Sequence, residues 1–199
     1  MTIIYPLGLH AKPRFSVMKN QERVVVFIDG SNFYHNLKNL FPDKKPFDFN
    51  FEKFVKVIAA NRRLLSTYYY NVPLDIMQDK EKYMKQQRFF DKIKRIPNFN
   101  FVLCRMQKRK VDGKAIYEVK EDDIHLAVDM VKLAYSGAYE TAILVSSDGD
   151  FVPAIQAIRE KGKNAENIGF ENKFSYHLKQ EANKFVMLKK KDVEQFFKP

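Results

Sequence analysis

Aspartates that follow apolar runs are the residues of this chain whose type and spacing best suit chemistry. Asp29 comes directly after the apolar run 24–28, and Asp148 and Asp150 come shortly after a second apolar run, 142–145. A strand buried on both faces ends in this way, so we expect these three acids at the carboxyl ends of two central strands.

A fourth acid comes from a helix predicted over residues 122–136. At about 100° per residue, Asp123 lies on the same side as the apolar residues of this segment. We therefore expect Asp123 to point inward over the strand ends, and Asp129 to point outward, where His125 and Lys132 can pair with it. The apolar residues that define the inward side are Leu126, Ala127, Met130, Val131 and Ala134.

Four carboxylates that converge in a partly desolvated cleft repel one another, so a cation must neutralise them. Mg²⁺ and similar hard divalent ions take oxygen ligands and leave places for water and phosphate. The chain as a whole is basic: 35 Lys and Arg exceed 24 Asp and Glu, which gives a formal charge of +11. An acidic pocket on a basic protein predicts metal-dependent phosphodiester chemistry, with the basic surface holding a nucleic acid.

Each acid also has a purely structural interpretation. Asp148 and Asp150 can cap the helix predicted after them. Asp29 can belong to a tight turn, and Asp122 or Asp123 can be a helix N-cap. Taken together, an acid directly after each of two buried strands and an inward acid on an intervening helix favour a metal site over these separate roles.

Other phosphate chemistries lack their sequence motifs. A Gly-x-x-x-x-Gly-Lys-Ser/Thr loop is absent, as is a Gly-x-Gly-x-x-Gly turn after the first strand, so P-loop and dinucleotide-binding folds are unsupported. Ser31 stands two residues after Asp29, where an aspartyl-phosphate phosphatase carries a second acid. The four histidines show no metal-ligand spacing, and the single cysteine, Cys104, lies in an apolar run as a core residue.

Strands alternate with helices along the chain. The predicted strands cover 24–28, 66–72, 99–105, 141–146, 164–170 and 185–188, and the predicted helices cover 32–40, 51–65, 79–95, 122–136, 151–161, 175–182 and 193–197. Ser31 is the expected N-cap of the first helix. An Asp-Gly pair between β-capable arms predicts a small hairpin between 105 and 118. This order predicts an α/β fold with a mainly parallel sheet, helices on both faces and the ligand site at the carboxyl ends of the strands.

The composition is that of a packed globular protein, with 45% hydrophobic and 14% aromatic residues among 199. Residues 1–22 show no periodicity and are expected to form an N-terminal extension. The first ten residues have no basic leader and no cleavage pattern, and no apolar window reaches the roughly 18 residues of a membrane-spanning helix. We therefore expect no signal peptide, no membrane association and a cytoplasmic location.

Three motifs follow one another along the chain: Phe27-Ile-Asp-Gly-Ser-Asn32, Lys120-Glu-Asp-Asp-Ile-His-Leu-Ala-Val-Asp129 and Leu144-Val-Ser-Ser-Asp-Gly-Asp-Phe151. Together they resemble the NYN domain family, in its LabA-like bacterial branch, within the PIN-like nuclease superfamily. The resemblance covers about residues 23–190 and implies a three-layer α/β/α PIN-like nuclease domain. Residues 191–199 would then form a C-terminal helical tail.

The resemblance also implies cleavage of RNA that depends on Mg²⁺ or Mn²⁺. By position, Asp29, Asp123 and Asp148 resemble metal-binding residues, Asp150 resembles a metal-site acid or an acid just behind the ligands, and Asn32 resembles a polar partner that positions water or phosphate. The family usually has Lys-Gly-x-Asp before the helix of the second motif. This chain has Lys120-Glu-Asp-Asp there, so both Asp122 and Asp123 are candidate ligands.

Cations and aromatic residues near the expected strand ends are candidates for RNA contact. They are Arg105, Lys108, Arg109, Lys110, Lys120, Tyr34 and Phe151. A basic hairpin beside the cleft could grip a single-stranded backbone, while the aromatic rings stack on bases. We therefore predict a metal-dependent ribonuclease that acts on RNA, most readily single-stranded RNA. A non-catalytic RNA-binding module with a vestigial acidic site, a small metal-dependent phosphomonoesterase and homo-oligomer formation all stay open.

Overall fold

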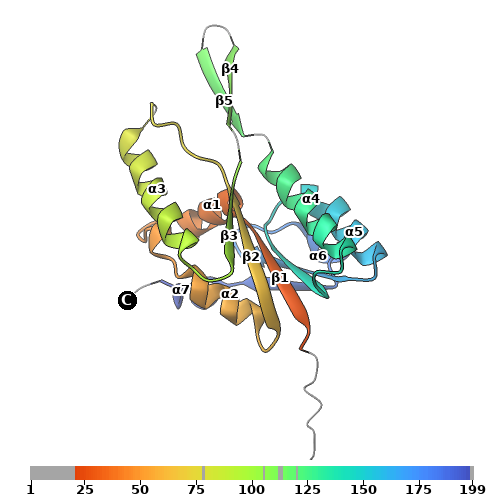
Figure 1. Ribbon diagram of the computed structural model, residues 1–199. Coiled ribbons are helices and arrows are strands. Elements are labelled where there is room, and N and C mark those ends of the chain that lie inside the picture. Colours follow the sequence, from red (N-terminus) through yellow and green to blue (C-terminus); the bar gives the residue numbers. More distant parts are fainter. Residues whose placement is uncertain (1–20, 78, 105, 112–113, 120, 198–199) are drawn as a thin grey trace, which may run out of the picture.

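Six parallel strands form the central sheet of the molecule (Figure 1). A computed structural model gives the structure of residues 21–197 except positions 78, 105, 112, 113 and 120, and between 105 and 120 it gives the backbone alone. The strands of this sheet are β1 (Arg23–Asp29), β2 (Arg63–Asn71), β3 (Phe99–Leu103), β6 (Thr141–Val145), β7 (Asn164–Phe170) and β8 (Lys184–Leu188). Their order is β3-β2-β1-β6-β7-β8, which confirms the predicted parallel α/β sheet.

Helices cover both faces of the sheet, as predicted. α1 (Gly30–Leu40), α2 (Phe51–Ala59), α3 (Lys80–Lys94) and α7 (Lys190–Glu194) pack on one face, and α4 (Asp122–Tyr135), α5 (Val152–Glu160) and α6 (Tyr176–Glu181) pack on the other. Two 3₁₀ turns, η1 (Pro46–Asp48) and η2 (Gly149–Phe151), precede α2 and α5. Successive residues of β1 point to opposite faces, and its apolar side chains are buried on both, so the strand enters both cores. In the described part of the chain, no helix has the length and apolar character to cross a membrane.

The order of the strands reverses around β1, which lies between β2 and β6. Asp29 at the end of β1 pairs with Tyr70 of β2, and Ile28 pairs with Val145 at the end of β6. In open α/β sheets, the crevice outside the carboxyl ends of the strands at such a reversal is the usual ligand site. The acids predicted to carry chemistry follow these two strands.

A separate hairpin connects β3 to α4. Its strands, β4 (Met106–Val111) and β5 (Lys114–Val119), pair in an antiparallel register and form a two-stranded sheet of their own, which confirms the predicted hairpin. Figure 1 shows it standing away from the body of the molecule at the carboxyl edge of the main sheet. The Asp-Gly pair at 112–113 lies outside the described residues.

Several predicted boundaries were wrong. The helix expected over 51–65 ends at Ala59, because Ala60 adopts a positive φ of 53° and β2 begins at Arg63. The last helix, expected over 193–197, is α7 at 190–194. Phe196 and Phe197 then pack in the core, and Phe197 bridges to Phe49, so this C-terminal segment lies on the main domain.

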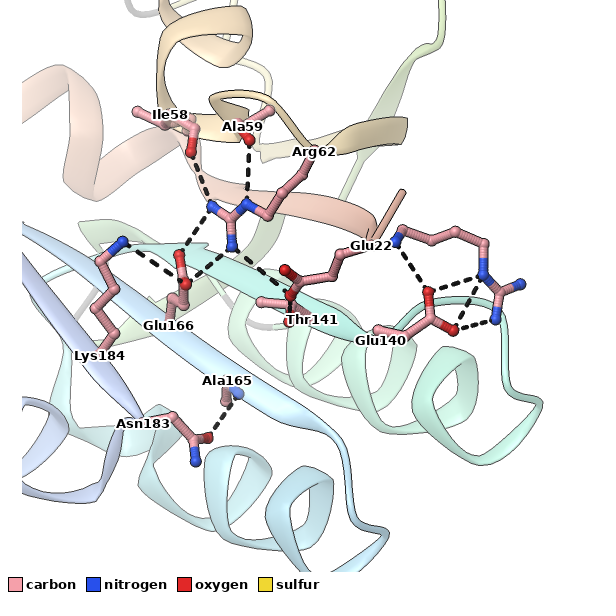
Figure 2. A network of polar contacts seen from close by, with 11 residues as sticks. Glu22, Ile58, Ala59, Arg62, Glu140, Thr141, Ala165, Glu166, Asn183 and Lys184 are labelled. Carbon is pink, nitrogen blue, oxygen red and sulfur yellow. Dashed lines mark hydrogen bonds and ion pairs between the residues drawn. The ribbon is translucent and has the colours of Figure 1, made fainter. Parts of the chain in front are cut away.

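At the amino edge of the sheet, Arg62 is the centre of a polar network (Figure 2). Its guanidinium donates to both carboxylate oxygens of Glu166 at 2.9 and 3.0 Å, and to the carbonyl oxygens of Ile58 and Ala59 at 3.0 and 3.1 Å. The two side chains are only 15% and 13% exposed. The network therefore joins the end of α2 to β7 in a largely desolvated place.

Glu166→Gln is expected to lower the free energy of unfolding by about 2 kcal/mol, because the largely buried Arg62 loses its nearer charged partner and keeps only Glu22, at 3.9 Å, among the described residues. Urea unfolding followed by circular dichroism measures this change. Glu52→Gln is the matched control: Glu52 pairs with Lys56 on an exposed helix face, so its loss should cost less than about 0.5 kcal/mol. Equal losses in the two variants would contradict the structural role of Arg62.

Candidate active site

Asp29 occupies the point where β1 passes into α1. It is the N-cap of α1: its Oδ1 accepts a hydrogen bond from the Asn32 N–H at 2.9 Å, and its Oδ2 accepts from Ser146 Oγ at 2.9 Å. The predicted cap, Ser31, lies within the helix instead. Asp29 is 6% exposed, and this burial raises its pKa to about 6 in spite of the two hydrogen bonds, with smaller contributions from the negative charges of Asp122 and Asp148.

Gly30 allows the chain to turn into α1 at this crowded position. A Cβ placed on Gly30 would lie 2.5 Å from the carbonyl oxygen of Tyr70 and 2.5 Å from the ring of Tyr69. The Asp-Gly pair is therefore fixed by close packing against β2. This packing holds Asp29 at the edge of the sheet.

The second acidic loop follows β6. Ser146 Oγ, which donates to Asp29, also accepts from the backbone N–H of Asp148 at 3.1 Å. Asp148 in turn caps η2, because its Oδ1 accepts from the Asp150 N–H at 3.0 Å. Asp148 is partly exposed and Asp150 is exposed. One serine thus links the acid after β1 to the acid after β6.

Asn32 joins the two loops from the side of α1. Its Oδ1 accepts from the Ser147 N–H at 3.1 Å and from Asn36 Nδ2 at 2.7 Å. Its own Nδ2 donates to no other described residue, so this amide can donate to a phosphate oxygen or a water. The predicted position of Asn32 beside the acids is consistent with these contacts.

Asp122 and Asp123 bring the start of α4 to the same place. Asp122 is 8% exposed, and burial raises its pKa. The pKa of Asp123 is raised to about 7, first by burial and then by the negative charges of four other aspartates. Those four are Asp29, Asp122, Asp148 and Asp150. The acids from three separate stretches of sequence therefore lie close enough to influence one another electrostatically.

The orientation predicted for α4 was wrong in part. Asp129 does not point outward to His125 and Lys132: its Oδ2 accepts a hydrogen bond at 2.9 Å from the hydroxyl of Tyr70, a buried residue of β2. The buried positions of the helix are Asp122, Leu126, Met130 and Ala134. Asp123 lies at the margin of this stripe, half-buried, because the helix is rotated from the predicted orientation.

The donor set suits a hard divalent cation. Five carboxylates meet at the carboxyl edge, and two of them have pKa values raised toward neutrality by burial and by one another. Among the side chains that the structure describes, no lysine, arginine or histidine forms an ion pair with any of these five. Within the same set, however, no three carboxylate, imidazole or thiol groups stand in position to ligate one ion. The carboxylate oxygens are therefore of the right chemical type to bind a divalent cation. For several of them to bind the same ion, their side chains would have to change rotamer and point toward it.

The predicted RNA-contacting residues have mixed outcomes. Phe151 was wrong as a stacking residue, because it is 1% exposed and belongs to the core beneath α4 and α5. Tyr34 lies about 200° around α1 from Asn32 and packs against Phe47, with ring centroids 5.8 Å apart. Lys108, Arg109 and Lys110 lie on β4, where side chains are not described, and Arg105 and Lys120 lie outside the described residues.

Cys104 is a core residue, as expected. It is buried, and burial raises the pKa of its thiol to about 11, with the nearby acids of α4 adding to the shift. A thiol with this pKa is protonated at neutral pH and is a weak nucleophile. The candidate chemistry of the site therefore belongs to the carboxylates.

The polar side chains that position the acids were not predicted. Ser146 and Ser147 form hydrogen bonds from the loop after β6 to Asp29 and to the carbonyl oxygen of Lys173. A serine pair between a buried strand and an acid was the available signal, because buried hydroxyl groups need hydrogen-bond partners. The segment that begins at Lys173 was also missed, although it lies beside the acids.

Comparisons with known proteins identify the domain. A sequence model described as the NYN domain matches residues 23–189. An uncharacterized protein of Methanocaldococcus jannaschii, MJ0482, is 35% identical over 66 residues, which are 33% of this chain and 28% of that protein's length. The crystal structure of a protein of unknown function, VPA0982 from Vibrio parahaemolyticus RIMD 2210633, has a TM-score of 0.66 and 21% identity, over 85% of this chain and 94% of that one. The structural likeness shows the shared fold, and the LabA-like branch stays a prediction.

Proposed function

This chain belongs to the NYN domain family, part of the PIN-like nuclease superfamily, and on that basis we propose that it is a metal-dependent ribonuclease that hydrolyses phosphodiester bonds of RNA. The observation that carries the proposal is the way the fold joins the acids: Ser146 Oγ donates to Asp29 after β1 and accepts from the backbone N–H of Asp148 after β6. Burial and the charges of these acids also raise the pKa of Asp123, at the start of α4, to about 7. Carboxylates that disfavour their own ionisation in this way gain most from a bound cation.

Asp29, Asp123 and Asp148, with Asp150 beside them, would hold Mg²⁺ or Mn²⁺ through carboxylate oxygens. Asp122, which is buried next to Asp29, is the alternative ligand on α4. When bound, such an ion supplies Lewis acidity, which makes water a better nucleophile at neutral pH and withdraws charge from a phosphate. Nucleases of this superfamily generally use divalent metal ions, and NYN nucleases typically bind RNA.

The chain's own polar groups would orient this set. Ser146 Oγ contacts both acidic loops, so it fixes the carboxylate of Asp29 relative to the backbone of Asp148. Asn32 Nδ2 would donate to a non-bridging phosphate oxygen of RNA, because its amide oxygen is already held by Ser147 and Asn36. The basic surface of the protein would attract the RNA backbone in a salt-dependent manner.

A cleavage assay tests the proposal. End-labelled single-stranded RNA is incubated with the protein and Mn²⁺ or Mg²⁺, and the products are separated on a denaturing gel. We expect fragments that disappear when EDTA removes the metal and return when metal is restored in excess. Absence of fragments with either ion, in protein that is folded by circular dichroism, would contradict the proposal.

A non-catalytic RNA-binding module is the second candidate function. It is favoured by the capping roles of Asp29 and Asp148, each of which already uses a carboxylate oxygen inside the fold. Tight, salt-sensitive binding of RNA without divalent ions and without fragments would identify it. Metal-dependent release of phosphate from mononucleotides alone would instead identify a phosphomonoesterase.

A further inference from the structure

Residues 173–179 form a surface segment beside the acids that combines exposed aromatic rings with lysine side chains. It is called the 173–179 segment below, and it includes the turn after β7 and the start of α6. Tyr176 is 62% exposed and Phe174 is 36% exposed. Among the described residues, neither Lys173 nor Lys179 forms an ion pair with a carboxylate. Exposed rings interleaved with free cations are the usual surface for single-stranded nucleic acid.

Direct contacts join this segment to the acidic loops. Ser147 Oγ, next to Asp148, donates to the carbonyl oxygen of Lys173 at 2.7 Å. Gly149, between Asp148 and Asp150, approaches Ser175 so closely that an added Cβ would lie 3.3 Å from the Ser175 Oγ. Tyr176 directly follows Ser175. The exposed tyrosine is thus one residue from a contact with the loop that carries two of the acids.

The segment is held rigidly. Phe170 and Lys173 exchange two backbone hydrogen bonds of 3.1 Å, and Ser175 caps α6 by accepting from the Leu178 N–H at 3.2 Å. A Cβ on Gly169 would lie 2.8 Å from the Cβ of Phe174, so the glycine lets the turn pack tightly onto β7. A rigid platform loses little conformational entropy when it binds a ligand.

Phe174 and Tyr176 have different surroundings. The ring of Phe174 packs against Phe185, with centroids 5.6 Å apart, and Lys179 Nζ lies 5.9 and 5.7 Å from the centres of these two rings. Phe174 therefore braces the segment and places the ammonium group of Lys179. No ring contact within the described structure involves Tyr176, so its faces are available for a base.

We propose that Tyr176 stacks on a base of single-stranded RNA next to the phosphate held at the acids, while Lys173 and Lys179 contact the backbone on either side of that base. The inference rests on the proposed function and adds the residues that would recognise an unpaired base. A base in a duplex is stacked on its neighbours and cannot offer its face to a side chain, so the site selects unpaired RNA.

Binding of single-stranded RNA to a cleavage-silent background tests this inference. The background is Asp148→Asn, which keeps the capping oxygen, and the probe is a fluorescein-labelled RNA of about 12 nucleotides followed by anisotropy in Mg²⁺. Adding Tyr176→Ala should weaken binding about 5- to 150-fold, whereas Tyr176→Phe should change it less than about threefold. Tyr135→Ala is the matched control, because Tyr135 is also exposed, at 54%, but lies at the far end of α4. This variant should leave binding unchanged.

Lys179→Ala tests the contact with the RNA backbone. It should reduce the slope of log Kd against log salt concentration by the amount expected for one lost phosphate contact.

The outcomes separate this inference from the proposed function. If RNA binds but Tyr176→Ala and Tyr135→Ala bind equally well, the stacking site is overturned and the nuclease proposal stands. If a duplex of the same sequence binds as tightly as the single strand, the selection of unpaired RNA is overturned. If neither the wild type nor the background variant binds RNA, RNA is not the substrate, and both proposals fail.

Discussion

Asp29→Asn is expected to abolish RNA cleavage and, at the same time, to stabilise the metal-free protein. Cleavage should fall by about 10³-fold or more, because a neutral amide cannot hold a divalent cation as a carboxylate does. Stability should rise, because burial raises the pKa of Asp29 from 3.8 to about 6, and ionising it in the folded protein at pH 8 costs on the order of 2–3 kcal/mol. The amide keeps the oxygen that accepts from the Asn32 N–H. Gel assays of RNA and thermal unfolding in EDTA measure the two effects.

Asp43→Asn is the control for this pair of opposite effects. Asp43 is exposed in the turn between α1 and η1, away from the acids, so its replacement should change neither cleavage nor the unfolding midpoint. A variant at Asp29 that lost both activity and stability would indicate a structural capping residue. In that case Asp29 would stabilise the start of α1, and the metal-site interpretation would be contradicted.

The parallel sheet and the meeting of the acids could be predicted from the sequence because both depend on simple patterns. Uninterrupted apolar runs identify strands buried on both faces, and parallel strands bring their carboxyl ends to one edge. Asp29 and Asp148 therefore had to lie near each other once their strands were neighbours. The pairing of Ile28 with Val145 confirms that neighbourhood.

The rotation of α4 could not be predicted in the same way. Apolar residues occur almost all round this helix: Leu126 and Met130 are buried, whereas Ile124 and Val128 are 68% and 43% exposed. A helical-wheel projection of α4 therefore has no single apolar side, and the elements that pack against the helix decide how it is rotated about its axis. The hydroxyl of Tyr70 needs an acceptor in the core, and Asp129 supplies it.

Contacts between loops could not be predicted from the sequence either. Phe151 looked like an accessible ring next to an acid, but η2 turns it into the core. Tyr176 belongs to no motif, and the contact of its neighbour Ser175 with Gly149 comes from the packing of the turn after β7. Such contacts are set by tertiary geometry, since the residues of short turns lack the sequence periodicity that predicts side-chain direction in helices and strands.

The stability of the metal-free protein is expected to depend on pH through the same acids. Asp29 and Asp123 have pKa values of about 6 and 7 in the folded protein and near 3.8 when unfolded. Well below pH 3.8 both acids are protonated in both states, and their contribution to folding is fully present; it is lost as the pH rises through the folded pKa values of about 6 and 7. The wild type should therefore lose stability relative to an Asp29→Asn/Asp123→Asn variant between pH 5 and pH 8. Urea unfolding in EDTA at a series of pH values measures the difference.

Added Mg²⁺ or Mn²⁺ should reverse this loss, and more strongly at pH 8 than at pH 5.5, because ligation requires deprotonated carboxylates. At about 100 times the Kd, the gain is about 2.7 kcal/mol. Glu140, whose pKa is lowered to about 2 by its hydrogen bonds with Arg23, is ionised throughout this range and does not disturb the comparison. A metal effect that is the same at both pH values, or that persists in the double variant, would place the cation elsewhere on the protein. A gain in the free energy of unfolding confined to the wild type at high pH would mean that the bound ion reduces the repulsion among the ionised carboxylates.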